Sequence, residues 1–174
     1  MVPQVLHRVI YGSTTPHESQ LAAVKIFPAL LPNHRRHRVV GCDYPAIVES
    51  SDESACVRGT YVEGLTAADM WRLDIFEGDE YERVSVSLRL LDQGGVPGES
   101  KVAETYRWIM PSEQLEDREW DFEEFRRDKL RDWVGGNASV DYYDGKLRPS
   151  IAGAFLVAAT CAVKLIIDIC HLRG

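Results

Sequence analysis

The sequence predicts a single domain that combines α-helices with β-strands. Its 174 residues, 45% hydrophobic and 27% charged, suit one globular domain with a sizeable core. Residues 84–90 alternate apolar and polar side chains, as a strand with one buried face does. Residues 65–77 instead place their apolar side chains at helical spacing. The two periodicities follow each other along the chain, which predicts that both element types are present.

The first third of the chain predicts one helix and several short strands. Val2–Ile10 has an amphipathic pattern, and Pro3 suits the first turn of a helix. Val24–Leu31 is strand-like, but Pro28 lacks the N–H that a ladder needs, which favours an edge or bulged strand. Two more strands are expected at 44–50 and 56–65.

The middle of the chain predicts a helix, a hairpin and a second helix. Thr66 is a suitable N-cap, Asp69 nearly completes a capping box, and Gly78 can end the helix. The alternating segments 81–92 and 101–110 flank a turn rich in glycine and predict a hairpin. A second amphipathic helix is expected over 119–136, with four side chains facing inward: Phe122, Phe125, Leu130 and Trp133.

Charge and cysteine content exclude several classes of function. The net charge of −7 opposes phosphate binding, so nucleic acid is not expected as a partner. None of the four cysteines forms a CxxC pair or a zinc-like Cys/His spacing, so no metal site is expected. Free thiols in the cytoplasm are the expected state of these cysteines. The basic run His34–Arg38 is predicted to be a solvated face, rather than a nucleic-acid patch or a two-histidine metal site.

The C-terminal end differs from the rest of the chain. We expect a domain over 1–135, a linker over 136–149 and an apolar segment over 150–174. Only Lys164 and Asp168 interrupt the apolar run 151–172, which predicts an apolar helix. That helix could dock on the domain, act as a membrane tail anchor, or reflect a misread exon. Each charge near a bilayer centre costs about 2.5–3.5 kcal/mol, so a tail anchor is marginal. We expect a cytoplasmic protein, with a membrane tail anchor as the alternative.

One carboxylate is a candidate for proton transfer. Glu77 lies at the junction of the helix over 65–77 and the strand that follows, directly after Ile75 and Phe76. An apolar setting raises the pKa of a carboxylate toward neutrality, as general acid–base catalysis requires. Spacing alone favours the alternative, in which Glu77 is a solvated residue that closes the helix.

Four segments taken together resemble one enzyme family. The segments YPAIVE, VRGTYVEGLT, WRLDIFEGDEYERVSV and EWDFEEFRRDKL are similar, in order and spacing, to the γ-glutamylcyclotransferase-like family, in particular its avirulence-induced-protein-like branch. The similarity extends from Val2 to Trp133. It implies an α+β fold in which helices flank a mixed, barrel-like sheet.

The resemblance also implies a reaction and the residues that perform it. The family motif D-x-x-E-G…Y-x-R falls on Asp74, Glu77, Gly78, Tyr81 and Arg83. In the family's cyclotransferases the glutamate takes a proton from the α-amine of a γ-glutamyl group. The amine then attacks the γ-carbonyl, and 5-oxoproline forms without a cofactor. Glu77 is therefore the expected catalytic residue, and a γ-glutamyl compound is the expected small-molecule substrate.

Two tyrosines are the expected substrate-binding residues. The resemblance implies that Tyr81 lies near the site and that Tyr44 shapes its wall. Packing is the alternative for Tyr81 and a simple strand start for Tyr44, while Arg83 is predicted to form a surface salt bridge. The chain could instead be a non-catalytic member of the family that acts as a binding or stress-response protein, and the oligomeric state stays open.

Tyr11-Gly12-Ser13 resembles the Tyr-Gly-Ser/Thr turn that ends the family's first strand. Two features oppose that assignment. The preceding segment Val2–Ile10 resembles the helix that follows the turn in the family, and Thr14 stands where the family has leucine. The interpretation is that these residues end the first helix, that the family's first strand is missing, and that an unpaired sheet edge is exposed.

Overall fold

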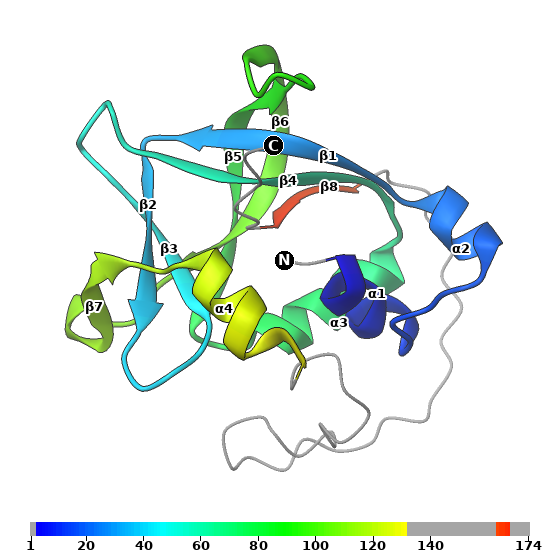
Figure 1. Cartoon of the computed structure of the whole chain (residues 1–174), viewed down its shortest axis with the longest axis horizontal. Helices are drawn as coiled ribbons and strands as arrows, with labels where there is room; N and C mark the ends of the chain where they lie inside the picture. Colours follow the sequence, from blue (N-terminus) through cyan, green and yellow to red (C-terminus); the bar gives the residue numbers. More distant parts are fainter. Residues whose placement is uncertain (1–2, 132–162, 168–174) are drawn as a thin grey trace.

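The computed structural model describes residues 3–131 and 163–167, whose arrangement is shown in Figure 1. The helices in these ranges are α1 (Pro3–Tyr11), α2 (Glu18–Ala23), α3 (Ala67–Glu77) and α4 (Phe122–Asp128). The strands in the same ranges are β1 (Lys25–Pro32), β2 (His34–Val39), β3 (Pro45–Glu49), β4 (Cys56–Leu65), β5 (Tyr81–Leu91), β6 (Pro97–Trp108), β7 (Leu115–Glu119) and β8 (Val163–Ile167). A short 3₁₀ turn, Ser112–Gln114, precedes β7.

The strands form two sheets (Figure 1). Five of the described strands close a barrel in the order β1-β4-β8-β6-β5, and the other three make a small sheet in the order β3-β2-β7. Paired strands run antiparallel except β6 and β8, which are parallel. The mixed, barrel-like sheet with flanking helices that the family resemblance implies is therefore present, and the predicted hairpin is the pair β5–β6.

Two apolar clusters fix the helices and strands on one another. Most of the first comes from the barrel strands: Ala29, Leu31, Ile47, Val57, Tyr61, Leu88 and Ala103. The second joins α1 and α3, which lie side by side in Figure 1, to β4 and β6: Leu6, Ile10, Val24, Val62, Leu65, Met70, Leu73 and Tyr106. Full burial of a side chain such as Leu73 contributes about 1.5–3 kcal/mol. The second cluster therefore anchors α3, the helix that ends at Glu77.

The first strand is not an edge strand, which corrects the prediction made from Pro28. Strand β1 pairs with β4 over its whole length and with β5 on its other side. Pro28 stands opposite Thr60 of β4. The pairing with β5 involves only Ala29 and Leu30, so the proline lies outside that short ladder.

The C-terminal segment is not a helix where the structure describes it. Residues 163–167 form β8, which pairs antiparallel with β4 and parallel with β6. The β-branched residues Val163, Ile166 and Ile167 favour this extended conformation. With β8 between β4 and β6, the barrel is closed within the described ranges, so the unpaired sheet edge expected from a missing first strand is not found there.

Other predictions for the C-terminal end lie outside the described residues. These are the linker over 136–149, the rest of the apolar run over 150–162 and 168–172, and Trp133. Among residues 3–131 and 163–167, no helix is long and apolar enough to cross a bilayer. Residues 163–167 belong to the barrel rather than to the helix on which a tail anchor would depend.

The basic run at 34–38 is only partly solvated, contrary to its prediction. It forms β2, the central strand of the small sheet, so alternate side chains point inward. His34 and Arg36 are buried, and the guanidinium of Arg36 lies 5.3 Å from the ring centre of Trp120.

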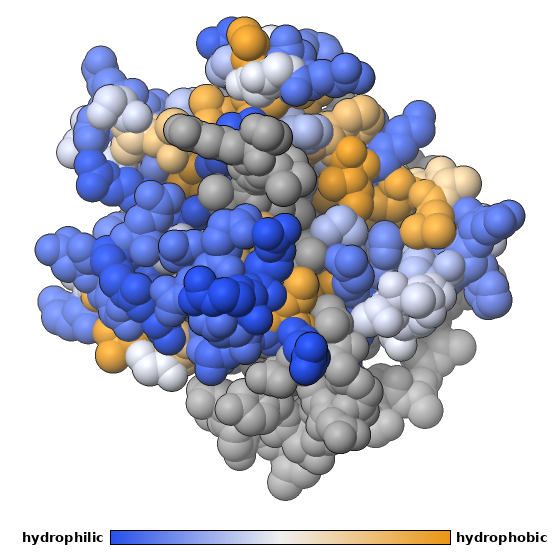
Figure 2. Space-filling view, viewed as in Figure 1, coloured by the Kyte–Doolittle hydropathy of each residue, from blue (hydrophilic) through white to orange (hydrophobic). Residues whose placement is uncertain are grey.

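Helix α4 begins at Phe122 rather than near 119, because the Asp121 side chain caps its first N–H groups. Figure 2 shows a hydrophilic surface over α4 and β7.

Candidate functional site

Helix α3 holds Glu77 at a defined point. The Thr66 side chain accepts a hydrogen bond from the Asp69 N–H, and the Asp69 carboxylate accepts from the Thr66 N–H, which completes the predicted capping box. Gly78 ends the helix with φ 81° and ψ −167°, and its N–H donates to the Asp74 carbonyl at 3.1 Å. A side chain at Gly78 would strain this backbone. Glu77 is therefore the last residue of a helix fixed at both ends.

The carboxyl of Glu77 is enclosed although the residue as a whole is only half-buried. Burial raises its pKa from 4.5 to about 7. The direction is the one expected from the sequence, although Ile75, one of the two apolar neighbours named there, is itself exposed. A carboxylate that titrates near neutrality can both accept and return a proton at the pH of a cell.

Tyr81 lies between Glu77 and the small sheet. Its hydroxyl donates to the Pro45 carbonyl at 2.9 Å, and its ring meets Trp108 edge-to-face with 5.2 Å between centres. Burial, followed by the charges of Glu77 and Tyr44, raises the pKa of this phenol far above its usual range. Tyr81 is therefore a neutral hydrogen-bond donor, and its pKa responds to both of the other predicted site residues, Glu77 and Tyr44.

Tyr44 directly precedes β3, half-buried in a cluster that contains Tyr81 and Trp108. It also borders a hollow of ≈ 340 Å³. The other residues around that hollow are Val39, Val40, Cys42, Glu80, Trp108, Glu113 and Gln114. The structure thus brings Glu77, Tyr81 and Tyr44 into one neighbourhood, with a hollow on the side of Tyr44.

Tyr106 and Trp108 are part of this neighbourhood and were not predicted as site residues. The Tyr106 hydroxyl donates to Asp74 Oδ1 at 2.7 Å. Burial, then the contact with Asp74, raises the pKa of this phenol far above its usual range, and the charge of Glu77 adds to the effect. The alternation of strand β6 places both aromatic side chains on one face, which is a signal that the sequence contains.

Arg83 forms the surface ion pairs predicted for it. Its Nε lies 3.7 Å from Asp74 Oδ1, and its Nη1 lies 3.6 Å from Glu104 Oε2. Both contacts are partly exposed, so each contributes at most about 1 kcal/mol. Arg83 therefore orients Asp74, which in turn accepts from Tyr106.

The segment Tyr11-Gly12-Ser13 lies at the end of α1, and Tyr11 packs against the same apolar cluster as Tyr81 and Tyr106. Tyr11 is the last residue of α1, its hydroxyl donates to the Gln20 carbonyl at 3.1 Å, and Gly12 follows with φ 70°. This agrees with the interpretation that Tyr11-Gly12-Ser13 ends the first helix.

Within residues 3–131, no group of three or more His, Cys, Asp or Glu side chains is arranged to hold a metal ion.

The raised pKa of Glu77 makes stability depend on pH. Between 4.5 and about 7 the folded state binds more protons at this group than the unfolded state does, so the free energy of unfolding falls as pH rises through that window. We expect this group to lower stability by about 2–3 kcal/mol between pH 5 and pH 8. Urea unfolding of wild type and Glu77→Gln at pH 5 and pH 8 measures this loss of stability, which should be larger in the wild type. An equal change in the free energy of unfolding in both proteins would contradict the raised pKa of Glu77.

Comparison with known proteins agrees with this architecture. A model of the family "Gamma-glutamyl cyclotransferase, AIG2-like" matches residues 9–127. Protein AIG2 C of Arabidopsis thaliana is 35% identical over 130 residues, covering 71% of this chain and 74% of its own length. AIG2-like protein B of the same plant is 34% identical over 155 residues, covering 87% and 86%. A solution structure of an Arabidopsis thaliana protein shares 28% identity, with a TM-score of 0.52 and coverage of 86% and 88%. The chain therefore belongs to the gamma-glutamyl cyclotransferase, AIG2-like family.

Proposed function

We propose that this chain is a γ-glutamyl cyclotransferase in which Glu77 is the general acid–base. The observation that supports this most directly is the enclosed carboxyl of Glu77 at the end of α3, whose pKa is raised to about 7. A solvated helix-terminal glutamate would keep a pKa near 4.5 and would be a poor proton acceptor for an amine. Membership of the family supplies the substrate class, a small molecule that carries a γ-glutamyl group.

The reaction needs little beyond folding the substrate back and moving protons. The Glu77 carboxylate takes a proton from the α-amine of the substrate, and the nitrogen attacks the γ-carbonyl carbon of the same γ-glutamyl group. The new bond closes a five-membered lactam while the original γ-amide bond breaks. Glu77 then gives its proton to the leaving nitrogen, so the products are 5-oxoproline and a free amine. Because both reacting groups belong to one molecule, positioning supplies much of the rate.

Tyr81 and Tyr44 are proposed as the substrate-binding residues. Tyr81 stays neutral, as its raised pKa requires, and presents an aromatic wall beside Glu77. Tyr44 borders the open hollow of ≈ 340 Å³. We place the departing amine in that hollow, because Tyr44 borders it and Glu77 does not.

The pH dependence of the reaction follows from the same carboxyl. Glu77 must be ionised to act as the base, so kcat/KM is expected to fall about tenfold per pH unit below the pKa of about 7. Above that value it should level off until the substrate amine or another group titrates. Rates of 5-oxoproline release measured from pH 5 to pH 9 test this, with γ-glutamyl amines and γ-glutamyl dipeptides as substrates. A profile that is flat between pH 5 and pH 7 would contradict the assignment.

A chain that releases no 5-oxoproline from any of these compounds would favour the alternative of a non-catalytic binding protein. In that case binding of the compounds without turnover is expected, which calorimetry with γ-glutamylethylamide would detect. Binding without turnover would be consistent with the proposed binding site and would contradict the proposed reaction.

A further inference from the structure

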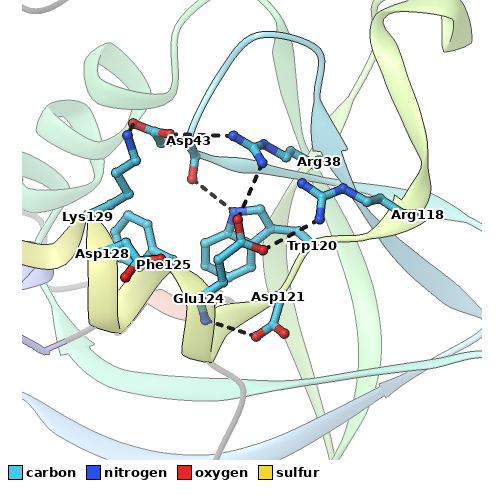
Figure 3. Close-up of a pocket in the computed structure, with 9 residues that line it drawn as sticks. All are labelled: Arg38, Asp43, Arg118, Trp120, Asp121, Glu124, Phe125, Asp128 and Lys129. Carbon is cyan, nitrogen blue, oxygen red and sulfur yellow. Dashed lines mark hydrogen bonds and ion pairs between the residues drawn. The ribbon is translucent and has the colours of Figure 1, made fainter.

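The turn between β2 and β3 is held by donors from separate parts of the fold. Arg38 Nε donates to the Cys42 carbonyl at 2.8 Å, and Trp120 Nε1 donates to the Asp43 carbonyl at 2.9 Å. Gly41 allows the turn its left-handed φ of 74°. The side chains involved lie around a small pocket shown in Figure 3, with Trp120 at its centre and Asp43 between Arg38 and Lys129.

Each carbonyl from Cys42 to Pro45 has a hydrogen-bond donor. Besides the two just described, the Tyr44 carbonyl accepts from the Val39 N–H at 3.3 Å, and the Pro45 carbonyl accepts from the Tyr81 hydroxyl at 2.9 Å. Because each backbone carbonyl is directed at its own donor, these contacts jointly set the path of the chain. Tyr44 lies between the points fixed by Trp120 and Tyr81, so its side chain is placed by both.

Trp120 is the most buried of the groups that connect the turn to α4. It is 7% exposed, and its ring packs on Phe125 with 5.2 Å between centres. The ion pairs in Figure 3, such as Lys129 Nζ to Asp43 Oδ2 at 3.4 Å and Arg38 Nη1 to Glu124 Oε1 at 3.7 Å, are partly exposed. Exposed ion pairs contribute little. The hydrogen bond from the Trp120 indole is therefore the main directional contact between the side chains around this pocket and the turn.

We propose that Trp120 is a positioning residue for the substrate-binding wall. Its indole N–H fixes the turn that carries Tyr44 and that presents the acceptor for Tyr81, the neighbour of Glu77. The proposal rests on the cyclotransferase function proposed above. Trp120 touches neither the substrate nor Glu77 in this scheme, so its loss weakens substrate binding and leaves the proton transfers unchanged.

Trp120→Phe tests this, because phenylalanine keeps an aromatic ring for Phe125 and Arg36 but has no N–H. We expect faster amide hydrogen exchange at Val39 and Cys42, whose N–H groups bond within the turn. We also expect KM to rise about threefold to tenfold with kcat unchanged within about twofold, which is the size of one lost hydrogen bond. The substrate is whichever γ-glutamyl amine or dipeptide the wild type converts fastest.

Two further variants separate positioning from general damage. Trp71→Phe removes the N–H of an indole on α3 that is 50% exposed, and neither exchange nor KM should change. Asp43→Asn keeps the backbone acceptor for Trp120 and weakens the pairs with Arg38 and Lys129. A KM change of about twofold or less is expected there, because these pairs are partly exposed.

The proposal is overturned if Trp120→Phe leaves exchange in the turn unchanged. It is equally overturned if exchange increases while KM stays constant, or if kcat alone falls. Failure of the proposed function looks different, because it is seen in the wild type as absent 5-oxoproline release. The exchange measurement still decides in that case whether Trp120 holds the turn.

Discussion

Replacing Glu77 by glutamine is expected to lower the rate of 5-oxoproline release by about 10²–10⁴-fold, the usual contribution of a positioned general acid–base. Glutamine has nearly the same shape, so the end of α3 and its Gly78 cap should persist. The amide cannot take a proton from the α-amine and cannot return one to the leaving nitrogen. Chromatographic quantification of 5-oxoproline, with wild type and variant at equal concentration, measures the effect.

The matched control for this variant is Glu53→Gln. Glu53 is an exposed residue in the polar turn between β3 and β4, and the same loss of charge there should leave the rate within about twofold of wild type. Circular dichroism and thermal unfolding show whether each variant is folded. Equal rates for Glu77→Gln and wild type would remove Glu77 from the mechanism, whatever the pKa of its carboxyl.

The local frame of Glu77 could be predicted from the sequence because its determinants are local. Thr66 and Asp69 are three residues apart, which is the spacing of a capping box, and Gly78 is the usual kind of residue for a helix end. The alternation of residues 81–92 and 101–110 around a glycine-rich turn likewise predicts the hairpin β5–β6, although not its register, in which Tyr81 stands opposite Trp108. Such signals depend on neighbours along the chain, so a single sequence carries them.

The wall of the site could not be predicted in the same way, because its contacts join distant residues. Trp120 donates to the carbonyl of Asp43, 77 positions away, and any residue can supply a backbone carbonyl. The burial of Arg36 against Trp120 is equally invisible in a run of five basic residues. Strand β8 was missed for a related reason: a short apolar segment fits a helix or a strand, and only its pairing with β4 decides between them.

The second large effect is expected at Gly64, where two backbone segments meet near the end of β4. A Cβ at this position would lie 2.0 Å from the carbonyl oxygen of Ala23, the last residue of α2. Gly64 also has φ 91°, which L-residues rarely adopt. Neither problem is relieved by a rotamer change, because both involve backbone. Just before Gly64, Glu63 pairs with Lys25 at the start of β1, and just after it the chain enters α3.

Gly64→Ala is therefore expected to lower the free energy of unfolding by about 3–5 kcal/mol, from backbone strain and overpacking combined. Gly12→Ala is the matched control, since Gly12 also has a positive φ, of 70°, but among the described residues no atom beyond its two chain neighbours lies within 4 Å of its Cβ position. Only the conformational strain of about 1 kcal/mol should remain there. Urea unfolding of both variants isolates the steric part, and similar losses would show that Ala23 and Gly64 do not approach closely. Because α3 starts only three residues after Gly64, at Ala67, a folded Gly64→Ala protein should also lose 5-oxoproline release, whereas Gly12→Ala should keep it.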